Sequence, residues 1–75
     1  MLKLQNVKGK VKYFDTRLGY GFIEVDGEDR DILVHYTVIR AKNFKNLKKG
    51  QEVIVDYIEH DSKLMATKVV AKRCN

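Results

Sequence analysis

The chain has little cysteine, and its single Cys74 cannot form a disulfide within one molecule. No cysteine and histidine cluster has the spacing of metal ligands, so neither cross-link common in very small domains is expected. Chains without disulfides are typical of reducing compartments. No stretch approaches the roughly 20 apolar residues of a membrane span, and the N-terminus lacks the apolar run of a signal peptide. We therefore expect a cytoplasmic protein with no metal, no cofactor and no membrane contact.

Proline and tryptophan are absent from the 75 residues. A chain this short buries only one hydrophobic core, which predicts a single domain over 1–75. Large catalytic folds are excluded, since an α/β barrel alone needs roughly 250 residues. No nucleophile, base and orienting group assemble either, because Cys74 is next to the last residue, His60 falls in an expected turn and His35 has no serine or cysteine nearby in its motif. We expect a protein that is not an enzyme and has no small-molecule substrate.

Apolar residues recur at every second position along much of the chain, which is the period of a β-strand. Val53, Val55 and Tyr57 form one such series. The pattern predicts five strands, at 8–15, 20–25, 31–36, 51–59 and 64–72. Short turns join the first three strands and the last two. Between them, 37–50 is a longer connection that can hold one helical turn near 36–40.

Five short strands close most economically as a barrel, because closure removes the free strand edges. An SH3-like barrel has a fitting strand count. A meander of three strands, one long connection and a final hairpin favours the OB type. We therefore expect an all-β fold, a five-stranded antiparallel OB barrel.

The charge is arranged in bands along the chain. Residues 1–23 carry +4 and 40–50 carry +5, whereas 24–31 carry −4, and the whole chain carries +5. A net positive charge steers a protein toward anionic partners, nucleic acid above all, although the same lysines can serve solubility alone. We expect the two basic bands to border a binding surface and the acidic segment 24–31 to lie away from it.

Aromatic side chains gather in the second expected strand. There Tyr20 and Phe22 point to one face, and Ile23 points to the other. If Ile23 lies in the core, both rings face solvent, with His35 beside them on the next strand. The reverse orientation buries the rings but exposes an aliphatic patch that soluble monomers avoid. The pattern favours outward rings beside lysines, a surface on which nucleic-acid bases stack at about 1–3 kcal/mol each.

Four motifs in order make the chain resemble the cold-shock domain family, from Gly9 to about Val70. The segment Gly19-Tyr20-Gly21-Phe22-Ile23 is similar to the family's first RNP-like motif, and Ile32-Leu33-Val34-His35 is similar to the second. The lead-in 9–15 and the segment 47–53 also match family patterns. The resemblance implies an OB fold that binds single-stranded RNA and DNA. It also implies a nucleic-acid chaperone that acts in cold adaptation or in regulating transcription and translation. We expect the protein to be a monomer.

Carried over position by position, the resemblance predicts which residues contact nucleic acid. Contacts to bases are expected from Tyr13, Phe14, Tyr20, Phe22, Leu33, His35, Tyr36 and Phe44, and polar contacts from Lys10, Lys12 and Asp15. Because Tyr13 and Phe14 are adjacent, one of them enters the core or a bulge re-aims it.

Four positions depart from the family pattern. Tyr13 replaces a tryptophan, Asp15 an asparagine, Leu18 a lysine and Leu33 a phenylalanine. These changes reduce the stacking area, while the connection 40–46 is more basic than is usual. We expect base-dependent binding to be weaker, and salt-dependent binding stronger, than in a typical family member.

Two alternatives share the fold. A protein-interaction module would hold a partner peptide on the same aromatic face. An S1-like RNA-binding domain would use the same barrel, and only the paired RNP-like motifs argue against it.

Overall fold

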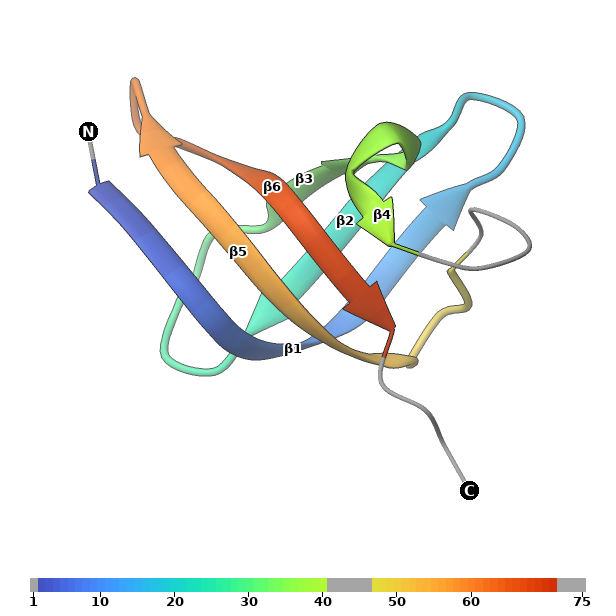
Figure 1. Ribbon diagram of the computed structural model, residues 1–75, viewed down its shortest axis with the longest axis horizontal. Coiled ribbons are helices and arrows are strands. Elements are labelled where there is room, and N and C mark those ends of the chain that lie inside the picture. Colours follow the sequence, from blue (N-terminus) through green and yellow to red (C-terminus); the bar gives the residue numbers. More distant parts are fainter. Residues whose placement is uncertain (1, 41–46, 72–75) are drawn as a thin grey trace.

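Six strands and one 3-10 turn form from the residues that this computed structural model describes, 2–40 and 47–71 (Figure 1). The elements are β1 (Leu2–Asp15), β2 (Tyr20–Val25), β3 (Ile32–His35), η1 (Tyr36–Val38), β4 (Ile39–Arg40), β5 (Glu52–His60) and β6 (Lys63–Ala71). β2 has the predicted bounds, and η1 confirms the helical turn expected near 36–40. β1 begins six residues earlier than predicted, at Leu2 instead of residue 8, because its first residues pair with β5.

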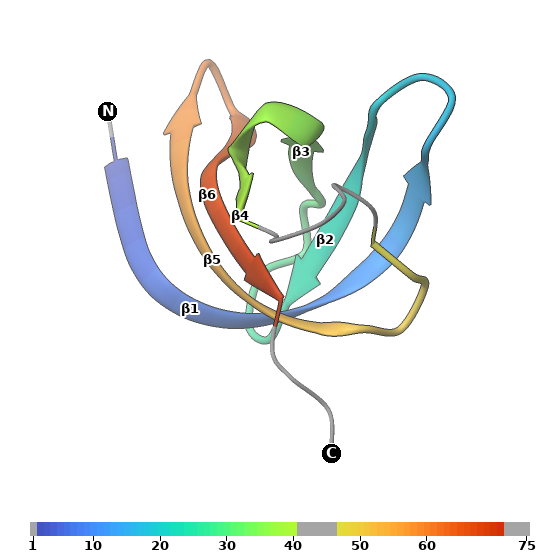
Figure 2. The same ribbon diagram turned by 45° about the vertical axis from the view of Figure 1, so that its right-hand side comes forward.

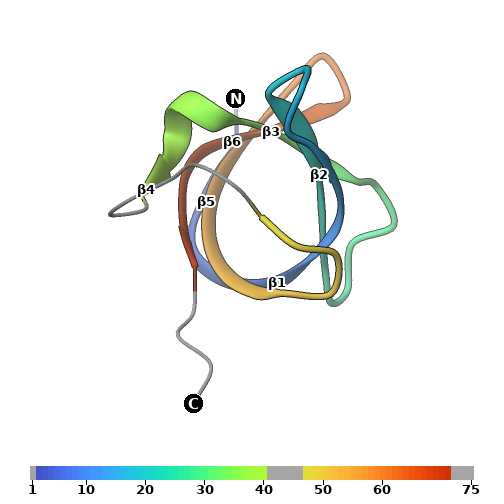
Figure 3. The same cartoon turned by 90° about the vertical axis from the view of Figure 1, so that its right-hand side faces the viewer.

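The strands close into a barrel, which confirms the all-β, five-stranded OB prediction (Figure 3). The strand order is β3-β2-β1-β5-β6, and β3 returns to β6. All hairpin-linked pairs are antiparallel as expected, but the closing pair β3–β6 is parallel, and so is the short β4–β6 pair. The barrel is therefore mixed rather than wholly antiparallel. Parallel pairing is open to β3 and β6 because a long connection and the strands β4 and β5 separate them in the chain.

The inward residues form one aliphatic core, in which Ile23, Ile32, Val34, Val55 and Val69 have no exposed surface. Leu47, from the long connection, also belongs to this core. Ile23 and the two β3 residues are those that the reversed orientation would have exposed. Their burial settles the face of β2: Tyr20 and Phe22 point outward.

β1 pairs with both β2 and β5, because it is long and two irregularities bend it around the barrel (Figure 2). One lies between Leu4 and Val7, where Asn6 has a φ of 56° and its N–H donates to the Asp56 carboxylate over 2.8 Å. The other lies between Val11 and Tyr13. Bulges increase strand twist and re-aim side chains. The second bulge is the one that matters for the outer face.

Candidate nucleic-acid interface

Cross-strand pairing places the outward aromatic residues in two rows. One row runs Tyr13, Phe22 and Leu33 from β1 through β2 to β3. The other runs Asp15, Tyr20 and His35 over the same three strands. Directly opposed residues in a sheet have Cβ atoms about 4.5–5.5 Å apart, so each row is a contiguous strip of side chains. His35 thus lies beside the rings, as the alternation predicted.

The rings are close but leave surface open. The centroids of Tyr13 and Phe22 lie 6.2 Å apart with 25° between the ring planes, while Tyr20 meets Phe22 edge-on at 6.4 Å. His35 and Tyr36 lie 4.6 Å apart. Tyr13 and Tyr36 are 40% and 43% exposed, and Tyr20 and Phe22 are half-buried. The set Tyr13, Tyr20, Phe22, Leu33, His35 and Tyr36 is called the aromatic platform below.

Tyr13 and Phe14 divide as their adjacency predicted. The bulge at Val11–Tyr13 aims Tyr13 outward against Phe22, whereas Phe14 packs partly against the core. Gly21 is buried opposite Phe14, where an added Cβ would lie 2.2 Å from the Tyr13 carbonyl oxygen and 2.6 Å from the Phe14 Cα. The close approach of β1 to β2 therefore depends on glycine at this position.

Gly19 supports the opposite end of the platform. Its φ is +80°, and an added Cβ would lie 2.9 Å from Cδ1 of the Tyr36 ring. The N–H of Tyr36 donates to the Gly19 carbonyl over 2.9 Å. The sequence alone does not predict this contact between Gly19 and Tyr36. The one local signal is a glycine next to an expected turn, because glycine adopts a positive φ without steric cost.

Asp15 already has backbone partners in the turn that follows β1. Its Oδ1 accepts from the N–H groups of Arg17, over 2.9 Å, and Leu18, over 3.0 Å. Desolvation, followed by the Asp15 charge, raises the pKa of the neighbouring Tyr13 phenol above its usual value of 10.0. Asp15 thus shapes the turn and disfavours ionisation of the Tyr13 phenol, two effects that are independent of any ligand.

Lys12 forms an ion pair that sequence reasoning missed. Its Nζ lies 3.2 Å from Asp31 Oδ2, although both side chains keep substantial exposure. Asp31, at the end of the acidic segment 24–31, therefore lies beside a residue that is predicted to contact nucleic acid, and the position of this segment relative to a bound strand stays a prediction. The two residues are far apart in sequence, and only the folded sheet brings them together.

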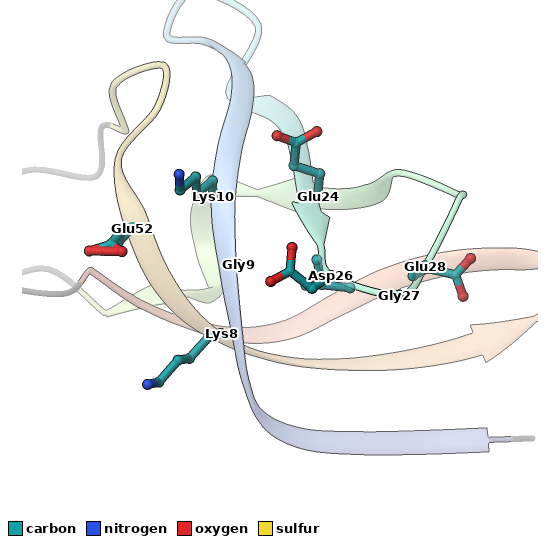
Figure 4. A pocket seen from close by; sticks show the side chains of 9 residues that line it. Lys8, Gly9, Lys10, Glu24, Asp26, Gly27, Glu28 and Glu52 are labelled. Carbon is teal, nitrogen blue, oxygen red and sulfur yellow. The ribbon is translucent and has the colours of Figure 1, made fainter.

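Lys10 lies in register between Glu24 of β2 and Glu52 of β5. These side chains border an open hollow of about 460 Å³, which is lined by Lys8, Gly9, Lys10, Glu24, Val25, Asp26, Gly27, Glu28 and Glu52. In Figure 4, Lys8 points away from Asp26. The hollow therefore mixes both signs of charge. Lys10 lies between the aromatic platform and this hollow.

Three further expectations concern Phe44, metal binding and membrane contact. Phe44 falls outside the described residues. Over residues 2–40 and 47–71, no His, Cys, Asp or Glu side chains gather in a group of three or more that could hold a metal ion. In the same part of the chain, no helix is long and apolar enough to cross a membrane.

A barrel of OB type with partly exposed rings on adjacent strands is the architecture of domains that bind single-stranded nucleic acid. Residues 7–72 match the family model of the 'Cold-shock' DNA-binding domain. The chain belongs to this cold-shock domain family, which binds nucleic acids, including single strands, and is not enzymatic. The resemblance carried by the four motifs is confirmed.

Curated relatives agree. The chain is 44% identical over 63 residues to cold shock protein CspB of Geobacillus stearothermophilus, covering 84% of this chain and 94% of that protein. It is 45% identical over 62 residues to CspD of Bacillus subtilis, covering 83% and 92%. Among solved structures, drosophila Unr CSD456 matches with a TM-score of 0.76 at 18% identity, over 95% of this chain and 28% of that one. This last likeness concerns the fold alone.

Proposed function

We propose that this protein binds single-stranded RNA and DNA by stacking bases on the aromatic platform. The observation that carries the proposal is the row Tyr13, Phe22 and Leu33, in which two near-parallel rings and a leucine lie side by side on the outer face of three strands. Any base has a π-face, so such a row accepts any sequence, at about 1–3 kcal/mol per stacked base.

Phosphate contacts supply the rest of the affinity. Lys10 and Lys12 border the platform, and Lys48 and Lys49 are exposed in the basic band 40–50. Because Lys12 is paired with Asp31, a phosphate must compete with that carboxylate. Binding should weaken with log[salt] at about −0.7 per neutralised phosphate, so about three to five contacts give a slope near −2 to −3.5.

Binding of this kind suits a nucleic-acid chaperone. Stacking competes with base pairing in the ligand, and weak sequence preference lets one small protein act on many transcripts. We assign the protein this role in the cytoplasm, in cold adaptation or in regulating transcription and translation. We also assign it a monomeric state.

Tyrosine fluorescence tests the proposal, because Tyr13, Tyr20 and Tyr36 belong to the platform while Tyr57 is buried. Titration with oligothymidine at two salt concentrations should quench the emission. Phe22→Ala should weaken binding by about 1–3 kcal/mol, which is about 5- to 150-fold, with the fold retained. Val70→Ser is the matched control, since Val70 is exposed on β6 and pairs with Ile54 and Arg40 instead of the platform.

Three results would count against this function. Unchanged affinity in Phe22→Ala would show that the rings do not contact bases. An affinity that does not change between low and moderate salt would contradict the proposed phosphate contacts. Capture of a peptide with no response to oligonucleotides would favour the protein-interaction module.

A further inference from the structure

The platform row does not end at Leu33. The closing parallel pair places Leu33 of β3 in register with Met65 of β6. Met65 is in turn paired with Ile58 of β5, and Ile58 with Lys3 of β1. Continuous pairing therefore extends the row Tyr13, Phe22 and Leu33 across the seam of the barrel onto Met65 and Ile58.

Both added residues lie on the outer face. Met65 is 47% exposed, while Leu64 before it is buried in the core. Ile58 is half-buried and follows the buried Tyr57. Neither side chain contributes to the buried core, so their apolar surface adds to that of the platform.

The spacing suits the next base of a strand that already lies on the platform. Neighbouring strands are about 4.8 Å apart, which puts Met65 about 10 Å from Phe22, two strand steps along the same row. A methionine side chain is flexible and its sulfur packs favourably against aromatic rings. The Met65 side chain can thus adapt its conformation to a base whose position is less fixed than that of a base stacked between two rings.

Charge around this extension is close to balanced. Lys3 and Lys63 are exposed nearby, at the positions paired with Ile58 and His60. On the same hairpin Glu59 is held by Arg30 at 2.6 Å, and the carboxylate of Asp61, in the turn, offsets one of the two lysines. A phosphate gains little electrostatic attraction here, so binding of a base at Met65 should depend on apolar packing and hardly on salt concentration.

We infer that the single-strand-binding surface continues over the β3–β6 seam, and that Met65, backed by Ile58, holds one further base of the bound strand. This inference rests on the proposed function of the platform, because continuity with the platform identifies a nucleotide as the occupant. It assigns the protein a longer site than its aromatic residues alone define.

Oligothymidines of two lengths test the inference, about four nucleotides to fill the rings and about eight to reach past them. Met65→Ser should weaken binding of the longer oligonucleotide about two- to tenfold and leave the shorter one unchanged. The salt slope should be the same in the variant and in the unaltered protein. Val70→Ser, five residues further along β6, should change neither affinity.

A second readout uses the unaltered protein. Hydrogen peroxide converts exposed methionine to its sulfoxide, and peptide mass spectrometry follows Met65 against free methionine as an internal standard. Saturation with the longer oligonucleotide should slow oxidation of Met65, whereas saturation with the shorter one should not.

The outcomes separate the two proposals. If Phe22→Ala weakens both lengths while Met65→Ser changes neither and oxidation continues unslowed, the platform stands and the extension is refuted. Equal weakening of both lengths by Met65→Ser also refutes the extension, because it indicates a change in the platform itself. If Phe22→Ala has no effect on either length, the proposed function fails first.

Discussion

Replacing Gly21 by alanine tests whether β1 and β2 approach as closely as the platform requires. The added Cβ would lie 2.2 Å from the Tyr13 carbonyl oxygen, 2.6 Å from the Phe14 Cα and 2.8 Å from the Phe14 Cδ1. Two of these atoms are backbone, so no side-chain rotation relieves the overlap. The strands must separate at the pair that aims Tyr13 toward Phe22.

The magnitude follows from the cost of overpacking. Inserting one carbon into a close-packed interior costs about 1–3 kcal/mol, and contacts with backbone place Gly21→Ala toward the upper end. In a domain of this size each kcal/mol lowers Tm by about 4–8 °C, so we expect a loss of roughly 10–20 °C. Separation of the strands should also disturb the Tyr13–Phe22 contact and weaken binding of oligothymidine.

Thermal unfolding followed by circular dichroism measures the stability, and tyrosine quenching measures the affinity. Gly27→Asn is the control, because nothing lies within 4 Å of a Cβ at Gly27 and asparagine tolerates its φ of +82°. The control should melt close to the unaltered protein. A Gly21→Ala variant that melts within about 2 °C of the unaltered protein would refute the close packing of β1 on β2.

Three further perturbations follow from particular side chains. Hydrogen bonds from Arg30 lower the pKa of Glu28 from 4.5 to about 2. The contact therefore stabilises the fold above about pH 4.5, and this stabilisation is lost as the pH falls toward 2. Melting curves of Glu28→Gln should lack that dependence on acid. Leu33→Phe should restore a ring to the row and tighten oligothymidine binding by about 1–3 kcal/mol. Desolvation and, after it, the Asp15 charge raise the pKa of Tyr13, so absorbance titration of Asp15→Asn should show a tyrosine that ionises at lower pH.

The outer face could be predicted because strand alternation is a local property. Once Ile23 is assigned to the core, Tyr20 and Phe22 must point outward, and the same rule puts His35 beside them. The bounds of β2 followed from the alternation and from the short turns that flank it. The first residues of β1 were harder to predict, because they become a strand only by pairing with β5, far along the chain.

Contacts between distant residues could not be predicted in the same way. The Lys12–Asp31 ion pair, the Asn6–Asp56 hydrogen bond and the Arg30–Glu59 pair each join separate strands or loops. Their formation depends on register, and a slip of one residue would move every side chain to the other face. The turn contacts of Asp15 could have been predicted from the sequence, since aspartate commonly accepts a hydrogen bond from the backbone N–H two residues ahead.

The sequence by itself determined the five main strands apart from the first residues of β1, the outward rings and the family, because alternation, turn residues and motif spacing are all properties of the linear chain. Only the tertiary structure decided which outward residues become neighbours. The parallel closure of β3 on β6 brings Met65 beside Leu33, and the bulge in β1 brings Tyr13 beside Phe22. Both result from how strands remote in sequence pair once a shared core is buried, and no local pattern records that pairing.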